Sequence, residues 1–188
     1  MSSQTDSRTK IVETASRLFQ LKGYTATGLN EILRESGAPR GSLYYYFPNG
    51  KEQLALAAVE LAGKSMREKV SSSLSRHREP VRAIAQVIQD MTAALRDDGK
   101  LQTMSLSMIA LETCQTSDLL REACARSFTK MAALYSEKLQ KSGFDAEQSA
   151  NLGSLLQSMI EGAITLSITE KDTAPLDTIL QFLPTLIR

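Results

Sequence analysis

The sequence is poor in the residues from which most catalytic and metal sites are built. Its 188 residues include no tryptophan, one histidine and two cysteines. A zinc site needs several histidine, cysteine or carboxylate ligands at close spacing, and a catalytic serine or cysteine needs a neighbouring base. The sequence offers neither arrangement, nor a glycine-rich loop of the kind that holds phosphates. We therefore expect no enzymatic activity, no metal and no cofactor, and we expect His77 to be a structural or surface residue.

Long apolar runs are also missing. No stretch approaches the roughly 20 apolar residues that a membrane-spanning helix needs. The polar start, Met1–Ser7, lacks the apolar core of a signal peptide. Cys114 and Cys124 fit reduced thiols in a helical core better than a disulfide framework. These features predict a cytoplasmic protein without a membrane partner.

A large net charge is absent as well, but the charges are unevenly distributed. The formal net charge is +1 at pH 7. Residues 1–51 carry seven basic and four acidic side chains, which leaves a net charge of −2 for the rest of the chain. The basic N-terminal segment has the sign that contact with DNA requires, although imbalances of this size also arise by chance.

Helical periodicity recurs along the chain, and strand patterns are almost absent. Ile11, Ala15, Leu18 and Phe19, for example, fall on one face of a helix. We predict an all-α fold of about nine helices, with an N-terminal head (1–52), a connecting helix (53–75) and a larger helical body (76–188). Asp145 is expected to cap a helix, and Pro184 to kink or shorten the last one. The predicted helical segments are about 7–21, 29–36, 39–46, 51–73, 80–96, 101–113, 118–141, 146–169 and 175–187.

The stretch from Thr27 to Lys51 has the pattern of a helix-turn-helix. A short helix with an apolar face ends at Gly37, which supplies a tight turn, and Pro39 suits the first turn of a second short helix. DNA-binding proteins with this motif place the second helix in the major groove, where its first turn meets the base edges. The sequence therefore predicts a DNA-binding head.

The first turn of the second helix carries residues suited to this contact. Arg40 is expected to pair with a guanine or to clamp a phosphate. Gly41 lets the backbone approach a base closely, and the Ser42 hydroxyl can donate to a phosphate or a base. These three residues are predicted DNA contacts.

Further candidates stand around this turn. Three consecutive tyrosines point about 100° apart on a helix, so at least one must be exposed. We expect Tyr44 and Tyr45, more than Tyr46, to face DNA with their hydroxyls near phosphates. Thr27 and Lys51 stand at helix starts, where the helix dipole helps to hold an anion.

The same stretch resembles the TetR family of bacterial transcriptional repressors. The resemblance covers about residues 8–60 and rests on Ile11–Phe19, Lys22–Tyr24, Thr27, Ile32, Gly37–Phe47 and Lys51–Leu54. Within the family, Ser36–Pro39 and Phe47–Glu52 look most like the branch of the LmrA and YxaF repressors. That branch is associated with multidrug-efflux genes and with aromatic inducers such as flavonoids. Tyr46 departs from the family pattern, where a histidine is common, and Asn49–Gly50 lengthens the link to the next helix.

The resemblance implies a homodimer that binds a near-palindromic operator. In the family the last two long helices form the dimer contact, here about residues 146–169 and 175–187. Two-fold symmetry would place the recognition helices roughly 34–36 Å apart, about one turn of DNA. The wide apolar surface of these helices fits this role, and a helix buried within one chain is the alternative. The predicted dimer contacts are Leu152, Leu155, Leu156, Met159, Ile160, Ala163, Ile164 and Leu183.

The resemblance also implies a small-molecule inducer bound among the middle helices of the body. Methionine side chains repack easily around varied ligands. Each residue of the predicted pocket, taken alone, also fits an ordinary core. An inducer that fits only the state with the heads splayed apart would pull the dimer off DNA. The predicted ligand contacts are Met91, Leu95, Met104, Met108, Leu111, Glu112, Phe128, Met131 and Tyr135.

One alternative to a repressor is a helical ligand-binding or scaffold protein whose N-terminal motif no longer binds DNA. Helix-turn-helix geometry occurs in such proteins, and the run Tyr44–Phe47 also fits a piece of core. A repressor is expected in the bacterial cytoplasm, associated with the nucleoid while bound to DNA. DNA binding that depends on Arg40 and Tyr44 separates the two alternatives.

Overall fold

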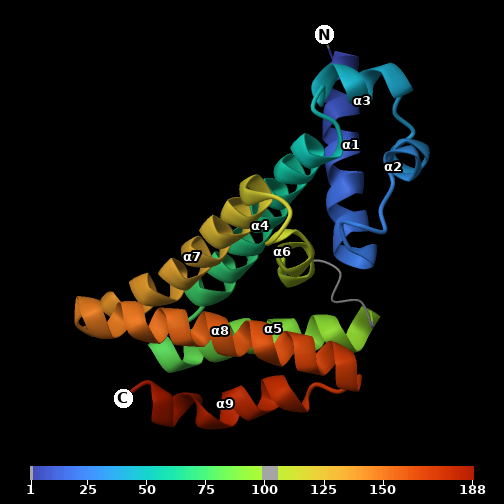
Figure 1. The fold of residues 1–188 in the computed structure, drawn as a ribbon. Coiled ribbons are helices and arrows are strands. Elements are labelled where there is room, and N and C mark those ends of the chain that lie inside the picture. The colour runs from blue at the N-terminus through green and yellow to red at the C-terminus, as the bar shows by residue number, and fades with distance from the viewer. Residues whose placement is uncertain (1, 99–105) are drawn as a thin grey trace. The chain divides into compact units, whose positions relative to one another are not determined.

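The computed structural model describes residues 2–98 and 106–188, which form nine helices and no strand (Figure 1). This confirms the predicted all-α fold. The helix ends lie within two residues of those predicted, apart from the start of α1 and the predicted segment 101–113, of which 101–105 lie outside the described residues. In chain order the helices are α1 (Ser2–Lys22), α2 (Leu29–Ser36), α3 (Arg40–Tyr46), α4 (Lys51–Ser75), α5 (Pro80–Asp98), α6 (Ser107–Thr113), α7 (Asp118–Gln140), α8 (Ala146–Glu170) and α9 (Ala174–Leu186).

Glycines and a capping side chain set several helix ends. Gly23 follows α1 and Gly37 follows α2, both with a positive φ (83° and 64°) that glycine adopts without strain. Asp145 caps α8 as predicted, because its carboxylate accepts the Gln148 N–H at 2.9 Å. The predicted shortening of α9 at Pro184 is wrong. The helix continues for two more residues past Pro184, although the ring nitrogen of this residue has no N–H to donate to the preceding turn.

The helices fold into two compact units. Unit 1 comprises Met1–Ser65 and Leu106–Ser127, and unit 2 comprises Met66–Ser105 and Phe128–Arg188. Helices α4 and α7 therefore each begin in unit 1 and end in unit 2. This division differs from the predicted boundaries at residues 52 and 75, because α6 packs against α1 and belongs with the N-terminal helices.

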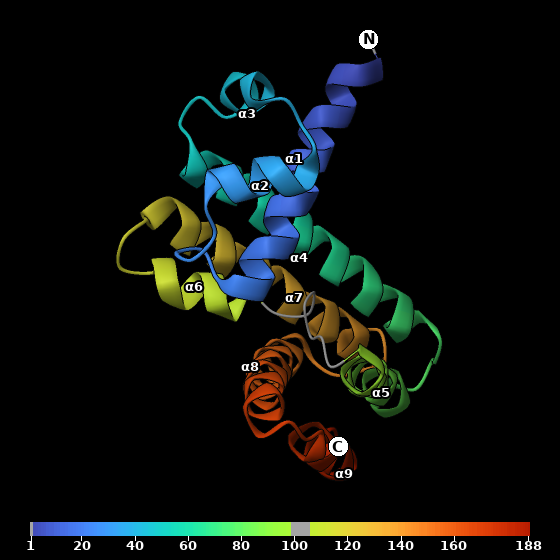
Figure 2. The ribbon, with the colours of Figure 1, turned by 90° about the vertical axis from the view of Figure 1, so that its right-hand side faces the viewer.

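The core of unit 1 lies between α1 and the short helices α2 and α3, which both pack against α1 (Figures 1 and 2). Ile32 of α2 and Leu43 of α3 are both 0% exposed, so one apolar side chain anchors each short helix. The predicted inner face of α1 is confirmed, since its four residues are at most 1% exposed: Ile11, Ala15, Leu18 and Phe19.

In unit 2, α9 packs against both α5 and α8 (Figure 2). The buried residues Leu176, Ile179 and Leu183 form its inner face. Helices α7 and α8 approach closely at Gly153. A Cβ placed there would lie 2.1 Å from the Ser136 hydroxyl oxygen and 2.7 Å from a backbone carbonyl oxygen of α7. The absence of a side chain at this position therefore permits the close packing of the two helices.

Replacing Gly153 with alanine is expected to destabilise the protein by about 1–3 kcal/mol, the usual cost of overpacking. The added methyl group would meet the α7 backbone, which cannot move aside as a flexible side chain does. Urea unfolding at one fixed protein concentration measures the change. The control is Gly41→Ala, where a Cβ meets nothing within 4 Å and stability should stay the same or rise slightly. A Gly153→Ala variant as stable as the wild type would contradict the tight contact.

Candidate nucleic-acid interface

The predicted helix-turn-helix is present in unit 1. Helix α2 begins after Gly28 and ends at Gly37, whose left-handed conformation (φ 64°, ψ 11°) turns the chain. Pro39 precedes α3 with a φ of −59°, close to the value that its ring imposes in any case. Only residues 37–39 join the two helices, a connection typical of this motif.

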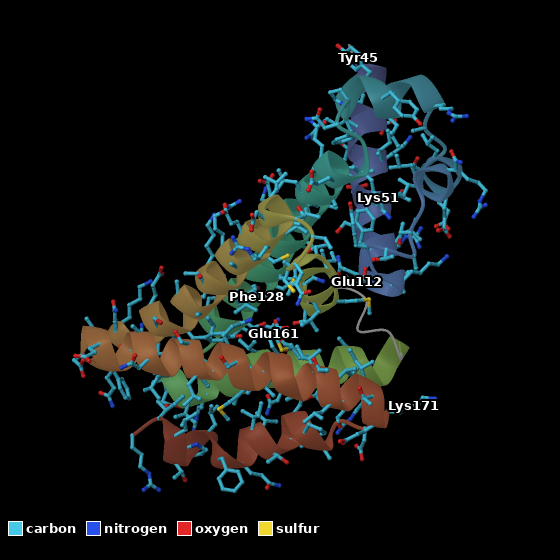
Figure 3. All side chains as sticks on the ribbon, in the orientation of Figure 1. Tyr45, Lys51, Glu112, Phe128, Glu161 and Lys171 are labelled. Carbon is cyan, nitrogen blue, oxygen red and sulfur yellow. The ribbon has the colours of Figure 1, made fainter. Side chains whose placement is uncertain are left out.

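Helix α3 has a buried side and an exposed side. Leu43, in the middle of the helix, and Phe47, just after it, are 0% and 2% exposed and fix it to the core. On the other side Arg40 is exposed, and Tyr44 and Tyr45 are 49% and 74% exposed. Figure 3 shows the Tyr45 side chain extending outward from α3. The helix therefore presents an arginine and two tyrosines to solvent.

The other predicted contacts in α3 are less prominent. Gly41 is exposed, and a Cβ built on it would meet nothing within 4 Å, so its backbone is open to a close approach. Ser42 and Tyr46 are half-buried. The Tyr46 ring packs edge-on against that of Tyr45, with 5.0 Å between the ring centroids. Of the three tyrosines, the two that we expected to face DNA are the two that the structure leaves exposed.

This exposed side has the chemistry of a DNA-contacting surface. Among the described residues Arg40 has no ion-pair partner, so its planar guanidinium is available for a guanine edge or a phosphate. The hydroxyls of Tyr44 and Tyr45 are donors of the kind that commonly contact phosphate oxygens. A helix of this type, anchored on one side and polar on the other, fits the recognition helix of the motif.

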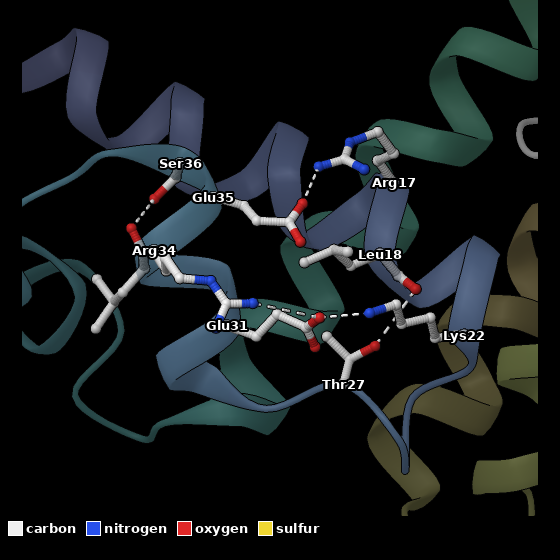
Figure 4. Close-up of polar contacts among 9 residues, drawn as sticks. Arg17, Leu18, Lys22, Thr27, Glu31, Arg34, Glu35 and Ser36 are labelled. Carbon is white, nitrogen blue, oxygen red and sulfur yellow. Dashed lines mark hydrogen bonds and ion pairs between the residues drawn. The ribbon is translucent and has the colours of Figure 1, made fainter.

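Ion pairs hold α2 in place beside α1 (Figure 4). Arg17 pairs with Glu35, and Lys22 pairs with Glu31. Arg34 also reaches Glu31, at 3.9 Å. Three of the basic side chains in the N-terminal segment are therefore partly neutralised by carboxylates of α2. Arg17, Lys22 and Arg34 are thus less available to DNA than unpaired basic side chains.

Sequence reasoning missed Arg8. This exposed residue of α1 places its guanidinium 5.7 Å from the centroid of the Phe47 ring, beside the end of α3. Its position three residues before Ile11 puts it near the buried face of α1, and that spacing was the signal in the sequence. Arg8 is therefore an exposed basic group beside the C-terminal end of α3.

The Lys22–Glu31 pair makes stability depend on pH. The hydrogen bond from Lys22, aided by the charges of Lys22 and Arg34, lowers the pKa of Glu31 from its ordinary value of 4.5, against the effect of burial. Because the folded-state pKa is lowered, the stabilisation is present above about pH 4.5 and is lost as the pH falls through the folded-state value. We expect Glu31→Gln to lower Tm near pH 7, with a difference from wild type that shrinks on acidification. A Tm difference that does not change with pH would contradict this assignment.

The hydroxyl of Thr27 does not face solvent, as a phosphate contact through it would require. The Thr27 side chain is 0% exposed, and its hydroxyl donates to the carbonyl oxygen of Gly23 at 2.8 Å. The hydroxyl also lies 3.3 Å from the Leu18 carbonyl oxygen, the contact drawn in Figure 4. The capping position of α2 is Gly28, which makes no side-chain hydrogen bond. The predicted phosphate contact of Thr27 is therefore wrong, because its hydroxyl is used to hold the link between α1 and α2.

Lys51 begins α4 as predicted, but its ammonium turns toward its own chain. Its Nζ lies 4.4 Å from the centroid of the Tyr24 ring and 3.4 Å from the Thr25 carbonyl oxygen. Burial lowers the pKa of Lys51, and the Glu112 carboxylate opposes this effect. Glu112 Oε2 in turn accepts the Thr25 N–H at 2.7 Å. Lys51 is thus a half-buried cation beside the link between α1 and α2, and it reaches a phosphate only by giving up these contacts.

Unit 2 contains a cavity of about 500 Å³. Three of the predicted ligand contacts, Met91, Met131 and Tyr135, are part of its lining. Met104, another predicted contact, lies outside the described residues. The cavity is a candidate ligand site built from α4, α5, α7 and α8.

Five other predicted ligand contacts are not in the lining of this cavity. Leu95 and Phe128 belong to unit 2 but lie outside the lining. Met108, Leu111 and Glu112 are carried by α6, which belongs to unit 1 because it packs against α1. Their predicted contact with a ligand therefore finds no support in this cavity. Glu112 in particular is a partner of the link between α1 and α2.

The predicted dimer contacts fall into two groups. Leu155 is 43% exposed, and Leu152 and Met159 are half-buried, so these three have surface left to cover. Leu166, which belongs to the same apolar surface of α8, is 52% exposed, and Phe182 of α9, which sequence reasoning missed, is 61% exposed. The remaining five predicted dimer contacts are at most 6% exposed within the protomer: Leu156, Ile160, Ala163, Ile164 and Leu183. Their side chains have almost no accessible surface left for a partner to cover, which corrects the prediction for them.

Membrane-spanning helices, metal sites and reactive cysteines are further features that the described part of the chain could carry. None of its helices is long and apolar enough to cross a membrane. Nor does it bring together three or more histidine, cysteine or carboxylate side chains in a way that would hold a metal ion. Cys114 and Cys124 are free thiols, and burial raises the pKa of Cys124 to about 11. The thiol of Cys124 is therefore protonated and inert at neutral pH.

Two families of known proteins match this chain, one in its N-terminal part and one in its C-terminal part. Residues 11–58 match the bacterial regulatory proteins of the tetR family, and residues 80–181 match the C-terminal domain of LmrA/YxaF-like transcriptional regulators. The chain is 45% identical to the HTH-type transcriptional regulator YxaF of Bacillus subtilis over 188 residues, which cover 100% of this chain and 98% of that protein. It is 39% identical to the HTH-type transcriptional regulator LmrA of the same species, over 97% of each chain.

Solved structures agree with these relatives. A TetR transcriptional regulator from Chloroflexus aurantiacus is 25% identical and superposes with a TM-score of 0.84 over 100% of this chain and 96% of that one. The reduced form of NemR from Escherichia coli, at 22% identity, has the same fold, with a TM-score of 0.84 over 97% and 98% of the two chains. The sequence relatives are transcriptional regulators and not enzymes. The chain belongs to the TetR family of bacterial transcriptional regulators and carries the C-terminal domain of the LmrA/YxaF-like branch.

Proposed function

We propose that this chain is a homodimeric repressor that binds a near-palindromic operator and leaves it when a small, mainly apolar or aromatic inducer binds. The observation that carries the proposal is the exposed side of α3, where Arg40, Tyr44 and Tyr45 face solvent from an anchored helix. Membership of a DNA-binding regulator family supports DNA as the partner. The branch resemblance supports efflux or detoxification genes as targets.

In the proposed complex, α3 enters the major groove with its first turn toward the bases. Arg40 pairs with a guanine or a phosphate, and Gly41 lets the backbone approach. Tyr44 and Tyr45 donate to phosphates on the sides of the groove, and Arg8 adds a positive charge near the end of α3. The half-buried Ser42, Tyr46 and Lys51 stay as secondary contacts.

The proposed dimer contact is the exposed apolar line on α8, here called the α8 stripe: Leu152, Leu155, Met159, Gly162 and Leu166. Its members alternate three and four residues apart, the spacing of helices that pack side by side. Phe182 adds a ring that is 61% exposed on the neighbouring α9. A Cβ placed on Gly162 meets nothing within 4 Å in the protomer, so there is room for a second helix to approach. Apolar surface of this extent on one face is typical of an interface.

The proposed inducer site is the cavity of unit 2. Its volume of about 500 Å³ is within the usual range for small-molecule sites. An inducer that binds more tightly to the conformation in which the two α3 helices no longer match the operator shifts the dimer toward that conformation. The protein would then act in the bacterial cytoplasm, on the nucleoid while bound and away from it when induced.

The direct test is binding to the DNA upstream of the protein's own gene. Fluorescence anisotropy at one fixed salt concentration compares this DNA with a scrambled duplex of the same length. We expect the upstream DNA to bind about 10³-fold more tightly or better, the usual ratio for specific recognition. Equal affinity for the two duplexes would contradict the proposal and favour the helical scaffold alternative.

A further inference from the structure

The cavity of unit 2 has an adaptable apolar wall. Met66, Met91 and Met131 contribute three thioether side chains from three different helices, α4, α5 and α7. Val87 and Ile160 add branched apolar groups. Unbranched methionines change conformation at little cost, so this wall can adjust to ring systems of different shape.

One polar part of the lining is already occupied by internal contacts. The Asp90 carboxylate accepts hydrogen bonds from the Ser73 hydroxyl, from Arg76 at 3.2 Å and from the Gln86 side chain at 2.9 Å. The charge of Asp90 is also paired with that of Arg76. These groups gain little from a ligand, because binding would replace hydrogen bonds that they already make.

A second polar part surrounds Tyr135. The Gln157 side chain, which is 7% exposed, donates to Glu161 Oε1 at 3.0 Å. Tyr135, Gln157 and Glu161 all line the cavity. Tyr135 is 0% exposed, and its hydroxyl has no hydrogen-bond partner among the described residues. Burial and the nearby Glu161 carboxylate raise the pKa of Tyr135, so its hydroxyl keeps its proton and remains a donor.

A buried hydroxyl without a partner is a cost that native proteins usually avoid. We propose that Tyr135 positions the inducer, donating a hydrogen bond to an acceptor oxygen, a carbonyl or an ether, on a neutral and largely apolar ring compound. This assignment rests on the proposed role of the cavity as the inducer site. Because the hydroxyl is sealed from solvent, a ligand reaches it when the side chain that covers it moves aside.

A neutral ligand fits the charges of the lining. Three carboxylates and two cations lie in the wall, and Asp90 and Arg76 among them pair with each other. A ligand carboxylate next to the Tyr135 hydroxyl would meet the negative charge of Glu161. An uncharged acceptor oxygen gains the hydrogen bond without that repulsion.

The test compares two ring compounds of nearly the same shape, 2-acetylnaphthalene and 2-isopropenylnaphthalene. The first has a ketone oxygen that accepts a hydrogen bond, and the second has a CH₂ group in the same place. Isothermal titration without DNA measures their affinities for the full chain and for Tyr135→Phe. We expect the wild type to bind the ketone about tenfold more tightly than the alkene, the effect of one good hydrogen bond. Tyr135→Phe should bind the two equally, with a Tm equal to or above that of the wild type. The control Tyr24→Phe removes a phenol hydroxyl in unit 1 and should keep the tenfold preference.

Three results would overturn the assignment. They are equal binding of the two probes by the wild type, an unchanged preference in Tyr135→Phe, and no binding of either probe up to its solubility limit. None of them bears on operator binding, which is measured with DNA and without ligand. If the protein bound upstream and scrambled DNA equally but showed a ketone preference that depends on Tyr135, the repressor proposal would be contradicted and the ligand site would be supported.

Discussion

The variant Leu155→Asp is expected to be monomeric at micromolar concentrations at which the wild type is a dimer. Leu155 is 43% exposed within the α8 stripe, where two-fold symmetry would bring both copies of the residue into one interface. Each buried aspartate without a partner costs about 3 kcal/mol or more. The dimer Kd should therefore rise about 10³-fold or more, as measured by sedimentation equilibrium.

The matched control for this variant is Leu119→Asp. Leu119 is also 43% exposed, but it lies on α7 within unit 1 and outside the α8 stripe. We expect Leu119→Asp to remain a dimer. A dimeric Leu155→Asp would contradict the assigned interface, and a loss of the dimer in both variants would show that the effect is not specific to the α8 stripe.

The second large effect is expected for Arg40→Ala. A bidentate arginine contact contributes about 1–3 kcal/mol of discrimination, and the dimer makes the contact twice. The affinity for the operator should therefore fall about 10²-fold or more, with no change in the dimer Kd. Fluorescence anisotropy at fixed salt gives the affinity, and the result should hold at protein concentrations well above the dimer Kd.

Arg126→Ala is the control for Arg40→Ala. Arg126 is an exposed arginine of α7 that pairs with Glu122 one helical turn away, at 3.4 Å, and it is not part of the helix-turn-helix. We expect its replacement to change operator affinity less than about twofold, because such exposed pairs contribute little. Equal losses in the two variants would mean that a diffuse positive surface, and not α3, holds the DNA.

The salt dependence separates two roles of Arg40. If Arg40 contacts a phosphate, its removal lowers the slope of log affinity against log salt by about one for each copy. If it reads a guanine, the slope changes little, and the loss disappears on an operator in which that base pair is altered. Both outcomes place α3 on the DNA, and they assign the arginine to different atoms.

The helix-turn-helix was readable from the sequence because its signals are local. Gly37 ends α2 by its positive φ, Pro39 fits the entry to α3, and the apolar residues Ile32 and Leu43 mark the buried sides. The exposure of Tyr44 follows from the same periodicity. Each of these inferences needs only the neighbouring residues and the geometry of a helix.

The errors concern side chains whose direction depends on distant partners. Threonine is a common N-cap residue of helices, but the Thr27 hydroxyl donates to the Gly23 carbonyl oxygen instead. Helix α8 carries apolar residues on more than one face, so its sequence does not tell the face that contains Ile160 from the face that contains Leu155. Glu112 was assigned to the pocket because α6 lies in the middle of the chain, and its contact with Thr25 spans 87 residues of sequence. Periodicity carries no information about contacts of that range.

A hydroxyl-radical footprint of the wild-type protein on its upstream DNA would show whether two α3 helices read one operator. The account predicts two protected segments, related by two-fold symmetry and centred about one helical turn, roughly 34–36 Å, apart. Leu155→Asp at the same concentration should remove both segments together, while Leu119→Asp should keep them. A single protected segment, or a footprint that Leu155→Asp leaves intact, would contradict the claim that two α3 helices read one operator through an α8 dimer.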